Sequence, residues 1–365
     1  MANFCIEKLQ VDKTIINFLK SQNDIIIDKH SAKGGNGQLF FGSNKITKKR
    51  VALKFYCIDG KDNSHEEVRI LSSIKDKNIL EVLDAKIISK DYAYFLTPEI
   101  VGGDLDKLIQ DGRIEINRSI SIVKDILKGL TTLHGKNYRL IHRDLKPGNV
   151  LIDVNKNAFI ADFGSIKVAP PKGNSVKATQ HSIIYRPPEA FLNSIFCFQS
   201  DIYQVGIILY QLLGGYFPYR DFDWLSEKEK KEYDSIKGNY ESTMYFNKVI
   251  SKKICSGKLL QYNSLSYTVS KRLRSIIKKS THVVLGKRYQ ATSEFMRDIH
   301  ESMKGAVDWC VDTNGITAIR PDHSKFRIVL EKNKYVVYKK SGKDWKKFGR
   351  INGTLEEIVD RINKL

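Results

Sequence analysis

The stretch "RLIHRDLKPGNVLID", residues 139–153, decides the fold expected of this 365-residue chain. In it an apolar run breaks into closely spaced polar residues: His142, Arg143, Asp144, Lys146 and Asn149. A surface turn could carry such residues without any chemical role. The alternative is a site whose chemistry needs a carboxylate, an ammonium and a carboxamide in one short loop.

A second motif, "FIADFGSIK" at residues 159–167, supplies another carboxylate, because Asp162 follows a short apolar run and precedes the permissive Gly164. Two carboxylates and an amide oxygen are hard ligands that suit Mg²⁺, which takes few protein ligands and completes its shell with phosphate and water. We therefore expect Asn149 and Asp162 to be metal ligands. Asp144 is then left to accept a proton.

Upstream, "SAKGGNGQLF" at residues 31–40 is a glycine-rich segment between two predicted strands. Its backbone N–H groups could cradle phosphate oxygens, although such a hairpin is more often only a turn. The next strand contains "VALK", in which Lys54 is a lone ammonium among apolar residues. A buried lysine is costly unless it is paired. Glu67, on the helix that follows, is the expected partner, and Glu66 is a second candidate.

Composition limits the class of protein. The formal net charge is +20, from 61 basic and 41 acidic residues, which suggests acidic partners such as nucleic acid, phosphoproteins or anionic lipid. A merely lysine-rich composition explains the charge equally well. We expect a soluble, intracellular protein, because no apolar window is long enough to span a membrane and the N-terminus lacks a secretory pattern. The five scattered cysteines fit free thiols in a reducing compartment.

Periodicity predicts two kinds of structure along the chain. The length favours two packed lobes or a domain with an appendage. Alternating apolar runs in the first hundred residues predict a small sheet with one helix after Ser64, and a short helix precedes it at residues 11–21. After Gly103 helical spacing dominates, and residues 220–238 form a charged stretch that we expect to be an exposed helix or loop. Beyond about residue 305 the period returns to two.

Six motifs occur in a fixed order: "GGNG" (34–37), "VALK" (51–54), the helix glutamate, "HRDLKPGN" (142–149), "DFG" (162–164) and "PPE" (187–189). Together they resemble the eukaryotic-type Ser/Thr protein kinase catalytic domain, over roughly residues 24–304. The resemblance implies an α+β, bilobal fold with a small β-rich N-lobe carrying one main helix and a larger helical C-lobe. We expect an N-terminal extension (1–23), the N-lobe and hinge (24–101), the C-lobe (102–304) and a small basic α+β module of unknown role (305–365).

The resemblance assigns roles to the motif residues. Lys54 is expected to hold the α- and β-phosphates of ATP while it is ion-paired to Glu67. Asp144 resembles the catalytic base that orients and deprotonates the substrate hydroxyl. Lys146 resembles the residue that neutralises the γ-phosphate and marks the serine/threonine-directed branch. Asn149 and Asp162 match the Mg²⁺ ligands, so the implied cofactors are ATP and Mg²⁺.

The glycine loop departs from the family pattern. When Leu39 takes the apolar place over the adenine, Gly34 and Gly37 fall on the second and third glycines, but Ala32 falls on the first. Alanine can adopt ordinary strand angles, so we expect nucleotide binding to survive with lower affinity.

The segment "YFLTPEIVGGDL", residues 94–105, resembles the connection between the lobes. Thr97 is expected to guard the back of the ATP pocket. Pro98 is acceptable next, because the adenine amino group needs only its carbonyl. Ile100 would donate its N–H to an adenine ring nitrogen. Further contacts are expected from Ala52 and Leu151 to the base and from Asp104 to the ribose.

Residues 165–187 have the length and polarity of an activation loop. Ser182 matches the hydroxyl that bridges the catalytic aspartate and lysine in Ser/Thr kinases. Ser175 and Thr179 are candidates for autophosphorylation, since an activation-loop phosphate can bind Arg143 and order the loop. Constitutive activity is the alternative.

Three residues are expected to support the site. Glu189 of "RPPE" should pair with Arg288 of "GKRYQAT", which would hold the end of the loop against the helical lobe. Asp201 should hydrogen-bond the backbone of the catalytic loop from the start of the next helix.

Residues 305–365 lie outside the resemblance. Three or four short strands and a helix with a capping box at Thr354 and Glu357 predict a small α+β module that packs on the helical lobe. Residues 327–350 carry nine basic side chains against two acids, with four aromatic residues interleaved. Such a segment could bind nucleic acid or another acidic partner. A sheet with a buried aromatic face and a solvated lysine face is the more ordinary interpretation.

The sequence predicts a Ser/Thr protein kinase that acts on protein hydroxyls in the cytoplasm, or in a host cytosol if it is a secreted effector. A pseudokinase scaffold would share the fold without the chemistry, but only Ala32 favours it. A small-molecule phosphotransferase shares a related fold and the catalytic aspartate, but would not be expected to carry the "PPE" segment and the activation loop.

Overall fold

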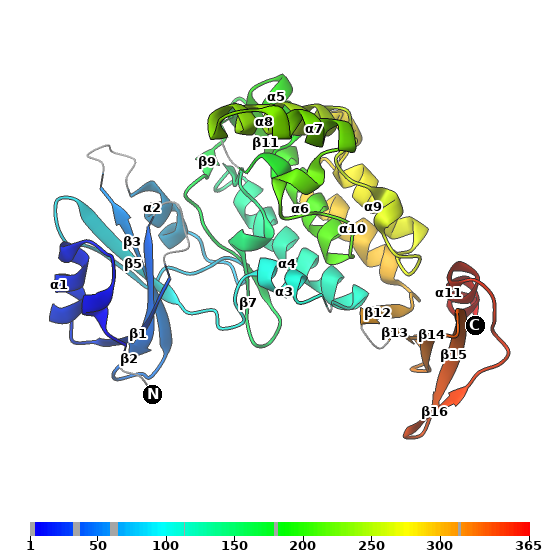
Figure 1. Ribbon diagram of the computed structural model, residues 1–365. Helices are drawn as coiled ribbons and strands as arrows, with labels where there is room; N and C mark the ends of the chain where they lie inside the picture. Colours follow the sequence, from blue (N-terminus) through cyan, green and yellow to red (C-terminus); the bar gives the residue numbers. More distant parts are fainter. Residues whose placement is uncertain (1–3, 32–36, 59–64, 113, 179–181, 313–314) are drawn as a thin grey trace. The chain divides into compact units, whose positions relative to one another are not determined.

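The computed structural model describes residues 4–31, 37–58, 65–112, 114–178, 182–312 and 315–365, and in it the chain divides into two compact units (Figure 1). The N-terminal unit comprises Met1–Gly103 and Leu151–Ile166. The C-terminal unit comprises Asp104–Val150 and Lys167–Leu365. The four segments expected from the sequence stay a proposal for the domain organisation.

The N-terminal unit is built on an antiparallel five-stranded sheet of order β1-β2-β3-β5-β4. Its strands are β1 (Ile25–Ser31), β2 (Gln38–Asn44), β3 (Arg50–Cys57), β4 (Asp84–Ile87) and β5 (Tyr92–Pro98). Its helices are α1 (Lys13–Ser21), α2 (Glu66–Ser73) and the short 3-10 helix η1 (Ile6–Lys8). Apolar side chains alternate along β2 and β3, so Phe40, Leu53 and Phe55 point together into a buried core.

Helix α1 belongs to the core of this sheet. Its buried Ile15 and Leu19 join the apolar cluster around Phe55. The ring of Phe18 lies 6.0 Å from that of Phe55 and 5.0 Å from that of Tyr94. The segment that the sequence suggested as an N-terminal extension is therefore packed on the sheet.

A later part of the chain completes the N-terminal unit. Strand β7 (Val150–Ile152) pairs with β8 (Ala158–Ile160), and β8 meets the segment before β4. Asn78 Nδ2 donates to the Ala158 carbonyl at 3.0 Å, and Ile160 N donates to the Asn78 carbonyl at 2.8 Å. Nearby, a Cβ on Gly102 would lie 2.1 Å from the Ile152 carbonyl oxygen, so only glycine fits there.

The C-terminal unit is mainly helical. Its helices are α3 (Leu105–Gln110), α4 (Ile116–His134), α5 (Pro188–Leu192), α6 (Phe198–Leu212), α7 (Glu227–Ser235), α8 (Asn239–Cys255), α9 (Lys271–Ser280), α10 (Thr292–Met303) and α11 (Leu355–Lys364). Its 3-10 helices are η2 (Pro147–Asn149), η3 (Ile183–Tyr185), η4 (Asp221–Trp224), η5 (Tyr262–Ser264) and η6 (Leu285–Lys287). Two short ribbons pair β6 (Leu140–Ile141) with β9 (Lys167–Val168), and β10 (Ser175–Lys177) with β11 (Ile195–Cys197).

Helix α6 is the core of the C-terminal unit, since every residue from Ser200 to Leu212 is buried. Its buried polar residues Asp201, Gln204 and Gln211 are all hydrogen-bonded, as buried polar groups must be to avoid a free-energy cost. Gly206 lets α6 and α9 approach closely, as a Cβ there would lie 2.4 Å from Ser280 Oγ of α9.

The charged stretch at residues 220–238 is only partly exposed. Helix α7 has no buried residue, as the sequence predicted. The start of the stretch is different, because Trp224 and Leu225 are buried. Trp224 Nε1 donates to the Pro218 carbonyl at 3.0 Å, and its ring packs edge-on against Phe217. This aromatic anchor corrects the expectation of an exposed segment.

The last sixty residues form an antiparallel sheet of five strands in chain order, followed by α11. The strands are β12 (Asp308–Asp312), β13 (Gly315–Ile319), β14 (Lys325–Glu331), β15 (Lys334–Ser341) and β16 (Asp344–Lys347). The expectation of three or four strands was wrong. Strand β12 lies at the start of α4, where Asn117 N donates to Asp308 Oδ1 at 3.0 Å. The capping box of Thr354 and Glu357 is formed.

Across the described parts of the chain, none of the helices combines the length and the apolar character that a membrane span requires.

Candidate active site

Lys54 lies at the centre of the first group of candidate residues, within the N-terminal unit. Strand β3 places it opposite Leu39 of β2 and Phe95 of β5. Its Nζ lies 2.8 Å from Glu67 Oε1 of α2 and 3.4 Å from Asp162 Oδ1. The sequence preferred Glu67 to Glu66 as the partner, and the structure gives Lys54 this same ion pair.

The charge of Lys54 is set by opposing effects. Desolvation is the largest and disfavours the ammonium, but the charges and hydrogen bonds of Glu67 and Asp162 together outweigh it. The net result is that the pKa of Lys54 lies above its ordinary value. Lys54 is therefore a permanent cation that can bind phosphate oxygens.

Asp162 is held in an unusual backbone conformation. Its φ of 59° lies in the left-handed region, which residues other than glycine rarely adopt. The next residue, Phe163, is buried, and its N–H donates to Glu67 Oε1 at 3.3 Å. The Asp162 side chain itself is 51% exposed. Backbone strain at such a position is typical of functional sites, and the exposed carboxylate is a suitable ligand for Mg²⁺.

The second group, within the C-terminal unit, surrounds Asp144. Asp144 Oδ2 lies 2.8 Å from Lys146 Nζ, and Asn149 Nδ2 donates to the Asp144 carbonyl at 2.7 Å and to Oδ2 at 3.1 Å. The buried Oδ1 of Asp144 has no hydrogen-bond partner among the described residues. A buried polar atom without a partner is costly, so this oxygen suits an external donor such as a hydroxyl. The orientation of Asn149 leaves its carboxamide oxygen for a cation.

Side chains of helix α6 hydrogen-bond the backbone of the loop that carries Asp144. Asp201 accepts hydrogen bonds from the backbone N–H groups of His142 and Arg143, both at 2.9 Å, and contacts His134 Nε2 at 2.8 Å. Gln204 receives the N–H of Leu145 at 3.0 Å and donates to the Arg143 carbonyl at 3.0 Å.

Asp201 was predicted from the sequence, but Gln204 was not. The available signal was its position one helical turn after Asp201, which places both side chains on the same face.

Glu189 and Arg288 form a buried, bidentate ion pair. Arg288 Nη1 and Nη2 lie 2.8 and 2.7 Å from the two carboxylate oxygens of Glu189. Ser200 Oγ adds a hydrogen bond to Glu189 at 2.6 Å. The pair joins α5 to the segment after η6, and both side chains are almost fully removed from solvent.

Two of the three hydroxyls predicted for the activation loop lie in described residues. Ser175 begins β10, which pairs with β11, and Arg143 Nη1 donates to the Lys177 carbonyl at 3.2 Å. Ser182 precedes η3, but among the described residues its hydroxyl makes no hydrogen bond to Asp144 or Lys146. Lys146 contacts Asp144 directly at 2.8 Å, and the bridging role of Ser182 stays a prediction. Thr179 lies outside the described residues.

A family model described as the protein kinase domain matches residues 28–298 of this chain. The chain belongs to the protein kinase family. The kinase domain is 30% identical over 210 residues to an Aurora kinase of Yarrowia lipolytica, a match that covers 55% of each chain.

Two further relatives are kinases by name. The chain is 32% identical over 196 residues to the mitogen-activated protein kinase mpkC of Neosartorya fischeri, covering 52% of this chain and 50% of the relative. It is 28% identical over 193 residues to the serine/threonine-protein kinase TIO of Arabidopsis thaliana, covering 51% and 14%. The kinase domain thus spans about half, or less, of the length of these relatives.

The residues predicted to surround the adenine fall into several elements. Ala52 and Thr97 are buried cross-strand partners on β3 and β5, and Pro98 ends β5. Leu39 lies on β2, opposite Lys54. Further members are Ile100, the second residue after β5, and Leu151, on β7. Their contacts to a nucleotide stay predictions.

Asp104 and Gly37 have local structural roles. Asp104 caps α3, because its Oδ1 accepts the N–H of Lys107 at 2.9 Å. A Cβ on Gly37 would lie 2.1 Å from the Phe55 carbonyl oxygen, so the close approach of β2 and β3 explains this glycine without phosphate. The predicted contacts of Ala32 and Gly34 lie outside the described residues.

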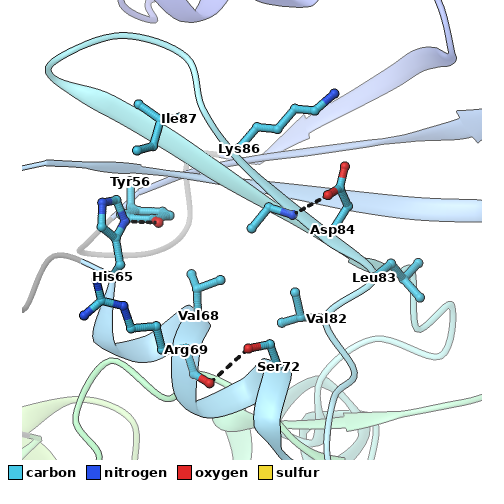
Figure 2. A pocket seen from close by; sticks show the side chains of 11 residues that line it. Tyr56, His65, Val68, Arg69, Ser72, Val82, Leu83, Asp84, Lys86 and Ile87 are labelled. Atoms are coloured by element: carbon cyan, nitrogen blue, oxygen red, sulfur yellow. Dashed lines mark hydrogen bonds between the residues drawn. The ribbon is translucent and has the colours of Figure 1, made fainter.

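A cavity of 330 Å³ in the kinase domain lies away from these residues, between α2 and β4 (Figure 2). Its lining includes Val68 and Arg69 of α2, and Asp84 and Ile87 of β4. Tyr56 and His65 close one end, with Tyr56 Oη 2.7 Å from His65 Nδ1. No residue predicted for catalysis or nucleotide binding lines this cavity, so we do not assign it to ATP.

Proposed function

We propose that this kinase domain transfers the γ-phosphate of ATP to serine and threonine hydroxyls of proteins. The single observation that carries the proposal is the arrangement of Asp144: its Oδ1 lacks a hydrogen-bond partner within the part of the chain that the structure describes, while its Oδ2 contacts Lys146 at 2.8 Å. A carboxylate with one available oxygen beside a fixed ammonium suits a base that receives a hydroxyl proton next to a phosphate.

The proposed reaction assigns one task to each residue. Lys54, kept in place by Glu67, binds the α- and β-phosphates. Asp144 accepts the proton of the substrate hydroxyl. The hydroxyl oxygen forms a bond to the γ-phosphorus, and the bond between the γ-phosphorus and the oxygen that bridges to the β-phosphate breaks. Lys146 stabilises the charge on the transferred group, and ADP carries away the leaving electron pair.

The donor set fits Mg²⁺. Asn149 presents a carboxamide oxygen and Asp162 an exposed carboxylate, and both are hard oxygen ligands. These two residues would hold the ion, which neutralises phosphate charge when it is bound. Members of this family use ATP and Mg²⁺, and we propose both cofactors for this chain.

Regulation and location belong to the same proposal. We infer autophosphorylation at Ser175 or Thr179, which an increase in intact mass after incubation with Mg²⁺ and ATP would reveal. An unchanged mass would exclude it. None of the five cysteines, all of which lie in described residues, forms a disulfide, which fits a reducing compartment such as the cytoplasm, or a host cytosol for a secreted effector. The basic C-terminal sheet is proposed to meet an acidic partner or nucleic acid.

A radiolabel assay with a generic protein substrate tests the main proposal. We expect label on serine and threonine with the wild type, and at least a ~10²-fold slower reaction with Asp144→Asn, the loss typical of one preorganised catalytic group. Asp360→Asn is the matched control, since Asp360 is exposed on α11. Equal labelling by Asp144→Asn and wild type would refute the assignment. No labelling by the wild type would favour a pseudokinase scaffold. Labelling of small molecules but not of protein would favour a small-molecule phosphotransferase.

A further inference from the structure

The C-terminal sheet has two different faces, because successive side chains of a strand point to opposite sides. One face is buried: Trp309, Ala318, Phe326, Ile328 and Val337 are almost inaccessible to solvent. Helix α11 packs on this face through its own buried residues, and Trp309 Nε1 donates to Asn363 Oδ1 at 3.2 Å.

The opposite side, which we call the basic face, carries most of the charge. Strand pairing aligns Thr317, Arg327, Tyr338 and Lys347 in one row across four strands. With neighbouring strands about 4.8 Å apart, the row extends roughly 14 Å. On β14, β15 and β16 the charged and aromatic members of the basic face are Lys325, Arg327, Glu331, Lys334, Tyr338, Lys340, Trp345 and Lys347. Asp308 of β12 lies on the same side and accepts the N–H of Asn117.

Arg327 and Trp345 form a stacked pair on the basic face. The guanidinium carbon lies 4.4 Å from the centre of the Trp345 ring, and Lys340 Nζ lies 5.9 Å from it. Arg327 Nε is buried and has no hydrogen-bond partner among the described residues. A guanidinium fixed by stacking keeps its planar donors in one orientation, which suits an external anion.

The charge of the basic face is strongly one-sided. Five cationic side chains are spread over β14, β15 and β16: Lys325, Arg327, Lys334, Lys340 and Lys347. Glu331 is the acid on these strands that shares the face, and its carboxylate accepts the Tyr338 hydroxyl at 2.5 Å. The more ordinary interpretation, with the aromatic residues buried and the lysines solvated, therefore describes only part of this sheet. Phe348 packs with Phe326 on the buried face, whereas Tyr338 and Trp345 lie among the lysines.

We propose that the basic face binds single-stranded nucleic acid. Separated cations match a chain of successive phosphates, and the planar groups of Tyr338, Trp345 and Arg327 provide surfaces on which bases can stack. An acidic peptide would use the charges but has no need of planar surfaces. This inference deepens the anionic-partner part of the proposed function and is independent of the phosphoryl-transfer reaction.

The test measures binding of a labelled oligouridylate and a labelled oligothymidylate of about 12 nucleotides, within the site sizes of single-strand binding domains, to the full chain by fluorescence anisotropy. We expect saturable binding of at least one of them and a slope of log K against log salt of about −0.7 for each phosphate contacted. The variant Lys340→Gln/Lys347→Gln should bind at least ~10-fold more weakly, because it loses two phosphate contacts. Arg327→Gln should also weaken binding.

The matched control is Lys228→Gln/Lys231→Gln, which removes two exposed lysines of α7 and should bind like the wild type. No binding of either oligonucleotide below ~100 μM, the weak end of non-specific affinity, would overturn the proposal. Equal loss in the control pair, or displacement by polyglutamate at equal charge concentration, would also overturn it and indicate charge alone or an acidic peptide. Peptide phosphorylation by the Lys340→Gln/Lys347→Gln variant should equal that of the wild type, so a failed kinase proposal is distinguishable.

Discussion

At the scale of single residues, Lys54 shows how a costly charge is kept in place for chemistry. Its ammonium is largely enclosed, yet two carboxylates raise its pKa above the ordinary value. An enclosed lysine without these partners would shed its proton or be destabilising. The arrangement of Glu67 and Asp162 around Lys54 therefore serves the cation rather than the packing of the sheet.

We predict that Lys54→Met slows phosphoryl transfer by at least ~10²-fold, because a preorganised electrostatic contact to the phosphates is lost. Steady-state kinetics with a peptide substrate measure the effect. Lys86→Met is the matched control, since Lys86 is exposed on β4 of the same sheet. Turnover of Lys54→Met at the wild-type rate would contradict the role given to this residue.

The Glu189–Arg288 pair leads to a second prediction at this scale. Removal of one partner from a buried ion pair leaves an uncompensated charge, so we expect Arg288→Met to lower the free energy of unfolding by about 3–5 kcal/mol. Urea denaturation measures the loss. The double variant Glu189→Leu/Arg288→Met should lose less than the single one, because it leaves no charge behind.

Arg220→Met is the control for this pair, since Arg220 is 81% exposed in its ion pair with Asp223. Such surface pairs contribute about 0–1 kcal/mol. A loss with Arg288→Met that is no larger than the loss with Arg220→Met would show that burial of the pair does not govern its contribution.

The sequence predicted individual residues best where short motifs fix their roles. Lys54 was predicted to pair with Glu67, and the structure contains this ion pair. The contact of Lys54 with Asp162 at 3.4 Å was not predicted. Gln204 was not predicted although it lies one helical turn after Asp201, because its hydrogen-bond partners, Arg143 and Leu145, lie in a loop far away in sequence. The positive φ of Asp162 was equally hidden, because tertiary contacts impose it.

At the scale of elements, three strands of the N-terminal sheet are joined by one arginine. Arg50 of β3 contacts the Asp28 carboxylate of β1, and its Nε lies 2.6 Å from Glu99 Oε2, directly after β5. Hydrogen bonds from Arg50 are the largest influence on Asp28 and hold its pKa below the ordinary value. The order of the strands makes these two ion pairs of Arg50 possible, since β1 and β5 lie on opposite sides of β2 and β3.

The Arg50–Asp28 ion pair gives a prediction about how stability depends on pH. The folded-state pKa of Asp28 is depressed, so its stabilising contribution is present above the unfolded value of about 3.8 and is lost as the pH falls below it. Arg50→Gln should lower the free energy of unfolding by about 0.5–1 kcal/mol near neutral pH, a modest amount because both side chains are partly exposed. The difference from wild type should shrink near pH ~3.

Urea denaturation at the two pH values measures this difference. Lys49→Gln removes a neighbouring exposed charge and should show no such change with pH. A difference between Arg50→Gln and wild type that stays constant down to pH ~3 would show that Asp28 does not titrate in this way.

Element predictions failed where a strand is defined by its neighbours. Strands β13, β14 and β15 have alternating apolar residues and were predicted. Strand β16, "DWKK", has four residues, and β12, "DWCVD", has three apolar residues in a row instead of an alternation. They become strands because the adjacent edges offer unpaired backbone groups. Trp224 was missed for a related reason, since one aromatic anchor cannot be recognised within a charged stretch.

At the scale of the whole molecule, the two units do not follow the chain in one continuous order. Residues 151–166 belong to the N-terminal unit, where β8 hydrogen-bonds Asn78 and forms a parallel bridge from Ile160 to Ile79. The sequence suggested contiguous segments instead, because motif boundaries are read along the chain. A hairpin that returns to an earlier unit is decided by tertiary contacts, which periodicity does not encode.

A prediction for the whole molecule concerns its ligands. Binding to the native state alone adds RT ln(1 + [L]/Kd), about 2.7 kcal/mol at a concentration 100 times Kd. We expect ATP with Mg²⁺ to raise the melting temperature, and chelation of Mg²⁺ by EDTA to reverse most of the increase. Asp162→Asn should show a smaller increase with Mg²⁺, and Asp360→Asn an increase like that of the wild type. An increase that is insensitive to EDTA would remove Mg²⁺ from the proposed site.

The contact between Gly102 and the Ile152 carbonyl has a consequence for how this chain can evolve. A side chain at position 102 would collide with main-chain atoms of Ile152. Rotation of a neighbouring side chain cannot relieve this collision. In a saturation library selected for folded protein, we expect position 102 to accept glycine alone. Purifying selection would then mark this residue as strongly as a catalytic one, although its constraint is steric.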